Sequence, residues 1–362
     1  MSNYYALILA GGRGTRFWPR SRKRHPKQVL SITGGDTLIQ ETVARLESLI
    51  PPERIWILTN DFVRDEIVRQ LPRVPAEQIV SEPAARNTAP AVALAAHILA
   101  SVDPDAVFGV FPSDHVIGNP DRFVDLLKPA FAAAEDGKLA VLGIEPQWPE
   151  TGYGYIQFPV GTDRGSLRTV PTSEFREKPD LDTAKSYLAA GNYSWNAGMF
   201  FWKAEVILSA LRKYLPKTAT IISSLPAFSD PQFPARLAEA FPLCEDISID
   251  YAVMQKAAKD ESVGVVGVPC DDFGWNDAGS WEAVYQLMPK DESQNVARSE
   301  VIAVKSTGNY VDCGSKVVAL IGVDDLIVVD TPDGLLITKR NLAQAVGDVP
   351  KKLDASGRQD LT

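Results

Sequence analysis

Short apolar runs alternate with longer segments of helical periodicity through the first 143 residues, and this alternation limits the folds open to the chain. The expected strands cover residues 5–10, 55–58, 106–111 and 139–143, and the expected helices cover residues 38–49, 91–100 and 123–134. Strands that alternate with helices in this way favour a mostly parallel sheet covered by helices on both faces. We therefore expect a Rossmann-like α/β fold for this part of the chain.

After about residue 295 the pattern changes to short β-rich runs separated by turn residues. These runs cover residues 301–304, 316–321, 326–330 and 335–338. A basic, weakly helical segment begins at Lys339, and the last dozen residues have the composition of a disordered end. We divide the chain into a first domain (1–290), a small C-terminal β-rich domain (296–345) and a flexible tail (346–362).

A glycine-rich, basic segment follows the first expected strand. Residues 11–16 read GGRGTR, and seven Arg and Lys residues lie between Arg13 and Lys27, with no acidic residue before Asp36. Glycines let backbone N–H groups converge on an anion, and guanidinium and ammonium groups add positive charge around it. The segment predicts a binding loop for a phosphate or polyphosphate. The alternative is a glycine turn beside a solvated basic helix.

The bulk properties are those of a soluble globular protein, and they limit its partners. Apolar residues make up 45% of the chain, and no apolar run approaches the roughly 18 residues of a membrane span. The start of the chain lacks the features of a secretion signal, so we expect a cytoplasmic protein with no membrane partner. A net charge of −9 argues against nucleic acid as a partner. We expect buried thiols at Cys244, Cys270 and Cys313, which are too scattered for a disulfide framework.

Residues 7–28, which read LILAGGRGTRFWPRSRKRHPKQ, contain neither G-x-x-x-x-G-K-[ST] nor G-x-G-x-x-G. The segment instead resembles the signature L-A-G-G-x-G-T-R-[LF]-W-P-x-S…P-K-Q of nucleotide-sugar pyrophosphorylases, most closely their mannose-1-phosphate guanylyltransferase branch. The resemblance implies a GT-A-like nucleotidyltransferase catalytic domain in residues 1–290. It also implies a small C-terminal domain of β-solenoid type, a left-handed β-helix, and a homodimer.

Two aspartates are candidates for holding a divalent metal. Asp114 follows an expected strand in a Pro-Ser turn, where it could offer oxygen ligands to Mg²⁺ or cap a helix. Asp277 lies among glycines and tryptophans in the segment GWNDAGSW (274–281), which suggests a tight pocket. The resemblance implies that Asp114 and Asp277 together hold Mg²⁺.

A second group of residues suits a sugar phosphate. Lys178 is a compact cation for a phosphate, and Glu177 can accept hydrogen bonds from vicinal hydroxyls, although the two could also be a surface charge pair. Gly152 and Tyr153 would let backbone and an aromatic face approach a sugar ring. Asn196 carries a donor and an acceptor for hydroxyls. The E-K-P element and the two glycine-aromatic segments match the resemblance.

The segment SEPAARNTAP (81–90) precedes the Ala-rich helix, and Thr88 is a plausible N-cap for that helix. Guanine offers N1–H and N2–H₂ on one edge, and the Glu82 carboxylate could accept both bonds, whereas adenine lacks this pair of donors. The run R-N-T-A-P resembles the guanylyl branch and adds Asn87 and Thr88 to the expected nucleotide site.

The resemblance implies transfer of GMP from GTP to mannose 1-phosphate, giving GDP-mannose and pyrophosphate by in-line, Mg²⁺-assisted attack on the α-phosphorus. The implied catalytic residues are Arg13, Arg16, Lys27, Lys178, Asp114 and Asp277. The implied nucleotide contacts are Leu9, Ala10, Gly11, Gly12, Arg13, Gly14, Thr15, Arg16, Lys27, Glu82, Asn87, Thr88, Ser113 and Asp114. Two alternatives stay open, namely a nucleotidyltransferase for another sugar, such as a manno-heptose 1-phosphate, and a non-catalytic regulatory subunit that binds a nucleotide sugar.

Overall fold

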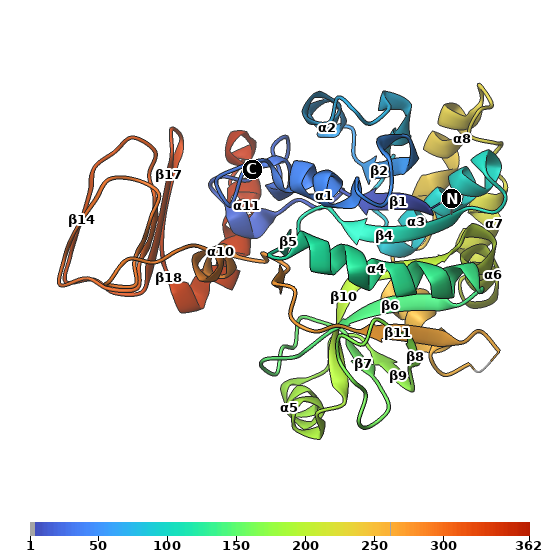
Figure 1. Cartoon of the computed structure of the whole chain (residues 1–362). Helices are drawn as coiled ribbons and strands as arrows, with labels where there is room; N and C mark the ends of the chain where they lie inside the picture. The colour runs from blue at the N-terminus through green and yellow to red at the C-terminus, as the bar shows by residue number, and fades with distance from the viewer. Residues whose placement is uncertain (1–3, 261) are drawn as a thin grey trace.

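The protein has a large α/β part and a smaller β-rich part formed by the C-terminal coils (Figure 1). The computed structural model describes residues 4–260 and 262–362. A ten-stranded sheet runs through the large part in the order β3-β2-β1-β4-β10-β6-β11-β8; β7 pairs with β10, and β9 pairs with β7. Its strands are β1 (Tyr4–Leu9), β2 (Ile55–Thr59), β3 (Ile79–Ser81), β4 (Val107–Pro112), β6 (Leu139–Ile144), β7 (Tyr155–Gln157), β8 (Val170–Pro171), β9 (Glu174–Arg176), β10 (Tyr193–Lys203) and β11 (Val265–Pro269).

The strands nearest the N-terminus form the parallel block that the alternating pattern predicts. β1 pairs in parallel with β2 and β4, and β2 pairs in parallel with β3. The long β10 then runs antiparallel between β4 and β6. The expected α/β fold is confirmed, and the antiparallel β10 makes the sheet a mixed one. Ends of parallel strands are where ligands of such sheets usually bind.

Helices cover both faces of the sheet because alternate residues of each strand point to opposite sides. Tyr5 and Leu7 of β1 join the core formed with α3 (Thr88–Val102) and α6 (Ala204–Tyr214). Ala6 and Ile8 join the core on the other face. That second core is formed with α1 (Leu38–Leu46) and α4 (Pro120–Glu135). The other α-helices before the C-terminal coils are α2 (Arg64–Gln70), α5 (Leu181–Ala190), α7 (Pro216–Ser223), α8 (Phe233–Ala240), α9 (Gln255–Ala257) and α10 (Trp281–Leu287).

The C-terminal part is built from stacked coils. β13 (Val296–Ala297), β15 (Tyr310–Asp312) and β17 (Leu326–Thr331) pair in parallel, and β18 (Gly334–Lys339) closes this sheet as an antiparallel strand. β14 (Val301–Val304) and β16 (Val318–Ile321) pair in parallel on another side. Inside the turns, buried Asn309 donates to Asn295 Oδ1 at 3.0 Å and accepts from the Leu326 amide at 2.9 Å. This asparagine ladder satisfies buried backbone groups between successive coils.

The end of the chain is ordered, and the expectation of a disordered tail is wrong. A 3₁₀ segment η7 (Arg340–Gly347), the helix α11 (Asp348–Ala355) and a last turn η8 (Gln359–Leu361) fold back onto the segment after β1. Trp18 Nε1 donates to the Leu361 carbonyl at 3.1 Å, and Lys23 pairs with Asp354 at 2.8 Å. The tail is fixed by contacts with residues more than 300 positions away, which its own composition does not reveal.

A third apolar core joins the two parts of the molecule. Phe17 and Trp18, which follow the glycine-rich segment, pack with Trp281 of α10, Tyr310 of β15 and Val346 of η7. The segment after β1 therefore rests on the C-terminal coils. None of the helices in the described part of the chain combines the length and the apolar character needed to cross a membrane, and the cytoplasmic location stays a prediction.

Candidate active site

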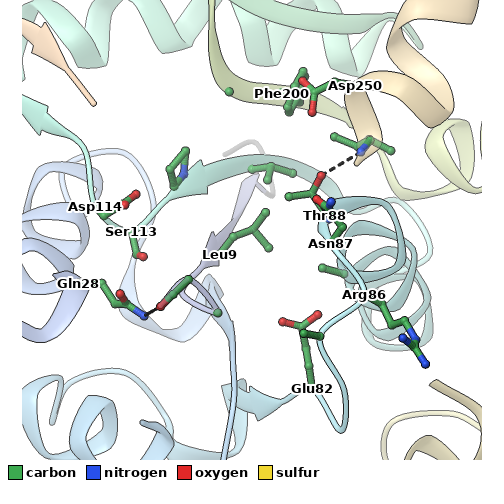
Figure 2. A pocket seen from close by; sticks show the side chains of 18 residues that line it. Leu9, Gln28, Glu82, Arg86, Asn87, Thr88, Ser113, Asp114, Phe200 and Asp250 are labelled. Carbon is green, nitrogen blue, oxygen red and sulfur yellow. Dashed lines mark hydrogen bonds between the residues drawn. The ribbon is translucent and has the colours of Figure 1, made fainter. Parts of the chain in front are cut away.

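A cavity of about 440 Å³ opens at the carboxyl ends of β1 and β4, as Figure 2 shows. The glycine-rich segment after β1 and the turn before α3 form two of its walls. Of the residues predicted for the nucleotide, the cavity brings together Leu9, Gly11, Gly12, Glu82, Asn87, Thr88, Ser113 and Asp114. Side chains from distant parts of the sequence thus converge on one site at the carboxyl ends of these strands.

Glycine is required at position 14 by the path of the loop. Gly14 has a φ of 57°, and a Cβ built on it would lie 2.6 Å from the Cβ and 2.8 Å from the amide nitrogen of Lys27. Gln28 Nε2 donates to the carbonyls of Ala10 at 2.7 Å and Gly12 at 3.0 Å. Ala10 is fully buried, so its backbone holds the loop and its side chain does not line the cavity.

Lys27 connects the two predicted metal aspartates. Its buried Nζ lies 3.1 Å from Asp114 Oδ2 and 2.8 Å from the backbone carbonyl oxygen of Asp277. The protein around Asp114 would by itself raise the pKa of that carboxyl, but the Lys27 ammonium and its other neighbours bring the pKa below its usual value. Asp114 is therefore a carboxylate at neutral pH.

His115 and Tyr153 complete the surroundings of the two aspartates. Burial lowers the pKa of His115 to about 4, despite the nearby Asp114 and Asp277. A neutral imidazole agrees with its contact to Trp275, whose Nε1 donates to His115 Nδ1 at 3.2 Å. Burial, followed by the interaction with Asp277, raises the pKa of Tyr153 above its usual value, so the Tyr153 hydroxyl stays protonated beside that carboxylate.

Two aspartate carboxylates are a donor set that suits a divalent cation which also binds phosphates. Mg²⁺ prefers oxygen ligands and is usually held by one or two carboxylates, with phosphate oxygens and water filling the other positions. The Asp114 side chain is 39% exposed, which leaves oxygen surface beyond its contact with Lys27. No cluster of three or more His, Cys, Asp or Glu side chains within the described residues has the arrangement of a metal site. The two aspartates would therefore need ligands from a substrate.

Glu82 lies at the opposite side of the cavity from Asp250 in Figure 2. A Cβ on Gly11 would lie 3.2 Å from Glu82 Oε2, so the carboxyl group packs closely against the glycine-rich segment. Burial raises the pKa of Glu82 from 4.5 to about 8. The carboxyl group is thus placed where a ligand that donates hydrogen bonds would stabilise its charged form.

The turn before α3 differs from expectation in its cap. Asn87, which has a φ of 63°, is the N-cap, and its side chain accepts a 2.9 Å hydrogen bond from the Thr88 amide. The expectation that Thr88 caps the helix is wrong because the helix begins at Thr88 itself. The Thr88 hydroxyl instead accepts a 2.9 Å hydrogen bond from the Ile249 amide, drawn as a dashed line in Figure 2.

The residues predicted for the sugar phosphate form a neighbouring group. Lys178 Nζ lies 3.5 Å from Glu177 Oε1, and its side chain is exposed, whereas that of Glu177 is buried. Asn196 Nδ2 donates to Asp250 Oδ1 at 2.8 Å. Tyr153 packs between Trp195 and Trp275, with ring centroids 5.3 and 5.6 Å away. Gly152 lies apart from these contacts in an exposed turn, where its amide donates to Glu150.

Two predicted arginines lie outside the cavity. Arg16 Nη1 donates to Gln344 Oε1 at 2.7 Å, so its guanidinium is held by η7. Arg13 and Thr15 line a small crevice with Lys23 and Asp354. The structure thus places these three residues between the cavity and the C-terminal segment, and not in the cavity wall.

Three site residues escaped prediction from the sequence. Gln28 was part of the matched P-K-Q element but received no role, although it holds the loop. Asp250 lines the cavity from the π-helical segment η6 (Asp250–Met254) before α9, and Gln344 contacts Arg16 from the far end of the chain. Asp250 and Gln344 stand in no glycine turn or strand end, so no local pattern indicated them.

Comparison with known proteins agrees with both parts of the fold. The nucleotidyl transferase family matches residues 5–294, and the MannoseP isomerase/GMP-like beta-helix domain matches residues 299–353. The chain is 39% identical to a mannose-1-phosphate guanylyltransferase of Escherichia coli (strain K12), over 99% of this chain and 75% of the relative. A Salmonella typhimurium mannose-1-phosphate guanylyltransferase, ManC, is also 39% identical, over 98% of this chain and 74% of the relative.

A solved structure gives the same result in three dimensions. The crystal structure titled mannose-1-phosphate geranyltransferase, from Thermus thermophilus, superposes with a TM-score of 0.84 at 32% identity and covers 98% of this chain and 100% of its own. The agreement includes the C-terminal coils as well as the large sheet, because the superposition spans nearly the whole chain. The chain therefore belongs to the nucleotidyl transferase family and, within it, to the group of the mannose-1-phosphate guanylyltransferases.

Proposed function

We propose that this protein transfers GMP from GTP to mannose 1-phosphate, releasing pyrophosphate and forming GDP-mannose. The observation that carries the proposal is the convergence at Lys27, where the glycine-rich segment, the Asp114 carboxylate and the Asp277 backbone meet beside a nucleotide-sized cavity. The guanylyltransferase names of the relatives support the choice of substrates.

In the proposed reaction, a phosphate oxygen of mannose 1-phosphate forms a bond to the α-phosphorus of GTP. The bond from the α-phosphorus to the oxygen that bridges to the β-phosphorus breaks, and pyrophosphate leaves with that electron pair. The attacking phosphate is already ionised at neutral pH, so no general base is needed. Positioning and electrostatic stabilisation then supply most of the catalysis.

Residues of this chain supply the positive charge for that step. Lys27 is held rigidly by Asp114 and Asp277 and would contact the α-phosphate. The backbone of residues 11–14 would bind the β- and γ-phosphates, with Arg13 and Arg16 adding charge from the side of the C-terminal segment. Lys178 would bind the phosphate of the sugar from the opposite side.

Asp114 and Asp277 would hold Mg²⁺ together with phosphate oxygens. When bound, such a cation neutralises phosphate charge and acts as a Lewis acid at the α-phosphorus. Lys27 would keep both aspartates in place through its two contacts, and Tyr153 would orient the Asp277 carboxylate by donating a hydrogen bond to it.

Glu82 would select guanine over adenine. Its carboxylate can accept hydrogen bonds from guanine N1–H and N2–H₂, whereas adenine would leave a partly buried carboxyl group without donors. An unpaired buried polar group is costly, so a site of this kind discriminates strongly. Gly11 leaves room for this carboxyl group beside the loop.

The proposal is tested by measuring pyrophosphate release with Mg²⁺ and each pair of GTP, ATP or UTP with mannose 1-phosphate or glucose 1-phosphate. We expect release from GTP with mannose 1-phosphate and less than a tenth of that rate from the other pairs. Equal rates with GTP and ATP would contradict the role of Glu82. Turnover with another sugar phosphate in place of mannose 1-phosphate would support a different sugar nucleotidyltransferase.

We also propose that two copies of the chain associate through the C-terminal coils. Ile302 of β14 and Ile321 of β16 are exposed apolar side chains on the outer face of a two-stranded sheet. Burying such side chains would stabilise a homodimer. Sedimentation of the wild type and of an Ile302→Lys, Ile321→Lys variant tests this: dimer for the first and monomer for the second is the expected result.

A further inference from the structure

Asp250 connects the nucleotide cavity with the group of residues around Glu177. Its side chain lines the cavity beside Phe200, on the side away from Glu82 (Figure 2). It also accepts a 2.8 Å hydrogen bond from Asn196, which lies against Gly154 near the Glu177 carboxyl group. Asp250 therefore stands between the place proposed for the nucleotide and the place proposed for the sugar phosphate.

One oxygen of the Glu177 carboxyl group lacks a partner among the described residues. Its Oε2 atom is buried, has no hydrogen-bond partner among the described residues, and would lie 2.5 Å from a Cβ on Gly154. Burial, followed by repulsion from Asp250, raises the pKa of Glu177 to about 7. Burial likewise raises the pKa of Asp250. Asp250 receives the hydrogen bond from Asn196, whereas Glu177 Oε2 needs a donor that the described residues do not supply.

The charges around this pair favour a sugar phosphate over a metal ion. Lys178 Nζ lies 3.5 Å from Glu177 Oε1, so a cation at the carboxylates would be repelled by the ammonium group. A sugar phosphate offers both complements at once, because its phosphate suits Lys178 and its hydroxyls can donate to the carboxylates. A carboxylate also forms stronger hydrogen bonds with neutral hydroxyl donors than an uncharged acceptor does.

Asn196 has its polar groups engaged within the protein. Its Nδ2 atom donates to Asp250, and its Oδ1 atom accepts a 3.0 Å hydrogen bond from the Gly198 amide. Asn196 is thus bound on both ends and orients Asp250. These contacts make Asn196 a positioning residue. From the sequence we expected Asn196 to bind sugar hydroxyls directly.

We propose that Asp250, oriented by Asn196, recognises hydroxyl groups of the sugar phosphate together with Glu177 and so helps to determine which sugar is used. The proposal rests on the proposed function, because it assumes that a sugar phosphate occupies this group of residues. The ribose of the nucleotide is the other source of hydroxyls near Asp250. The hydrogen bond from Asn196 and the electrostatic interactions with Glu177 and Lys178 link Asp250 to the group proposed for the sugar phosphate, which favours the sugar ring.

The test compares wild type with Asp250→Asn, using mannose 1-phosphate and its 2-deoxy, 3-deoxy and 4-deoxy analogues. Removing the hydroxyl that Asp250 binds should lower the wild-type kcat/KM about 10- to 100-fold, the usual strength of a hydrogen bond to a charged group. In Asp250→Asn, the loss for that analogue should shrink to about threefold, and the KM for GTP should stay unchanged. Asp246→Asn, an exposed aspartate four residues earlier, is the matched control and should behave like wild type.

A second arm uses 2′-deoxy-GTP and 3′-deoxy-GTP. If Asp250→Asn loses discrimination against these nucleotides and keeps that against the deoxy sugars, Asp250 binds the ribose and the proposal is overturned. Unchanged discrimination in both arms overturns it as well. If Asp250→Asn does not fold, as judged by thermal unfolding, Asn196→Ala replaces it, with the same expected loss of discrimination between mannose 1-phosphate and its analogue.

Failure of this inference and failure of the proposed function are separable. Wild-type turnover with GTP and mannose 1-phosphate tests the function alone, whatever Asp250→Asn does. If the wild type releases no pyrophosphate, calorimetric binding of mannose 1-phosphate to wild type and Asp250→Asn still decides the inference. An affinity at least tenfold weaker for the variant supports it, and equal affinities overturn it.

Discussion

Arg16 and Gln344 are 328 positions apart in the sequence, yet Arg16 Nη1 donates a 2.7 Å hydrogen bond to Gln344 Oε1. A Cβ on Gly347 would lie 3.2 Å from Arg16 Cγ, so the same C-terminal segment also packs on the arginine stem. The basic loop after β1 and the C-terminal segment are therefore one structural unit. In the proposed reaction, the C-terminal part of the chain would place an arginine for the triphosphate.

Replacing Gln344 with Ala should weaken GTP use without changing the use of mannose 1-phosphate. The hydrogen bond is exposed, so its loss corresponds to a change of about 2- to 10-fold in kcat/KM for GTP. Steady-state kinetics with each substrate varied in turn measures the effect. Gln232→Ala, another exposed glutamine, is the control. An equal loss for both substrates would argue for a general structural defect.

Replacing Asp277 with Asn, or Arg16 with Ala, should lower kcat by at least about 100-fold, the usual scale for losing one electrostatic stabiliser. Asp277 is proposed to hold the metal ion and Arg16 to bind the triphosphate. Circular dichroism checks that each variant is folded, and Glu292→Gln, at an exposed position, is the control. Near-normal turnover of folded Asp277→Asn would refute the metal role.

Gly14→Ala should destabilise the protein and abolish turnover, because the residue has a positive φ and its new Cβ would meet the backbone of Lys27. A residue forced into an unsuitable backbone conformation typically costs more than about 1 kcal/mol. Gly12→Ala is the matched control for stability, since a Cβ there has nothing within 4 Å. Urea unfolding of the two variants should give a clearly lower midpoint for Gly14→Ala, and equal midpoints would contradict this account of the loop.

GTP affinity should depend on the ionisation of Glu82. Burial raises the pKa of Glu82 to about 8 in the free protein. The form of Glu82 that can accept both hydrogen bonds from guanine is the carboxylate. Affinity for GTP should therefore rise between about pH 6 and pH 8 and level off at higher pH. Calorimetry at several pH values measures this, with Glu82→Gln expected to bind weakly and to lack the rise. Parallel curves for wild type and variant would exclude Glu82 from base recognition.

The same pKa predicts a fall in stability of the free protein with rising pH. An unfolded Glu82 loses its proton near the ordinary pKa of 4.5, whereas the folded one keeps it up to about pH 8. Between these values the unfolded state binds fewer protons, so the free energy of unfolding decreases as the pH rises. Melting temperatures of wild type and Glu82→Gln should therefore diverge from pH 5 to pH 8 in favour of the variant. Glu77→Gln, an exposed neighbour, should not diverge from wild type.

Local patterns account for what the sequence could predict. The strands β1 and β4 are short apolar runs ending at glycine or proline, so their ends, and with them Gly11 and Asp114, could be placed beforehand. The helix α3 (Thr88–Val102) begins before the predicted range 91–100, because its cap is Asn87 and not a residue further along. Lys27 and Asp277 were found from matched motifs, but their contact across 250 positions was visible only in the fold.

Contacts between distant segments account for what was missed. Asp250 begins the π-helical segment η6 (Asp250–Met254), and its surroundings come from β10 and the loop after β9, so nothing near it in the sequence marks it. The order of the C-terminal tail arises from Trp18 and Lys23, which receive its last residues. The composition of such a polar, basic C-terminal segment predicts disorder unless the surface that binds the segment is known.

The central claim is tested most directly by identifying the products made by the wild type and by Lys27→Ala. Each protein is incubated with GTP, Mg²⁺ and ¹³C-labelled mannose 1-phosphate, and the nucleotide sugars are analysed by mass spectrometry. We expect labelled GDP-mannose and pyrophosphate in a 1:1 ratio from the wild type, and at least about 100-fold less from Lys27→Ala. No labelled GDP-mannose from the wild type, or undiminished product from folded Lys27→Ala, would contradict the account.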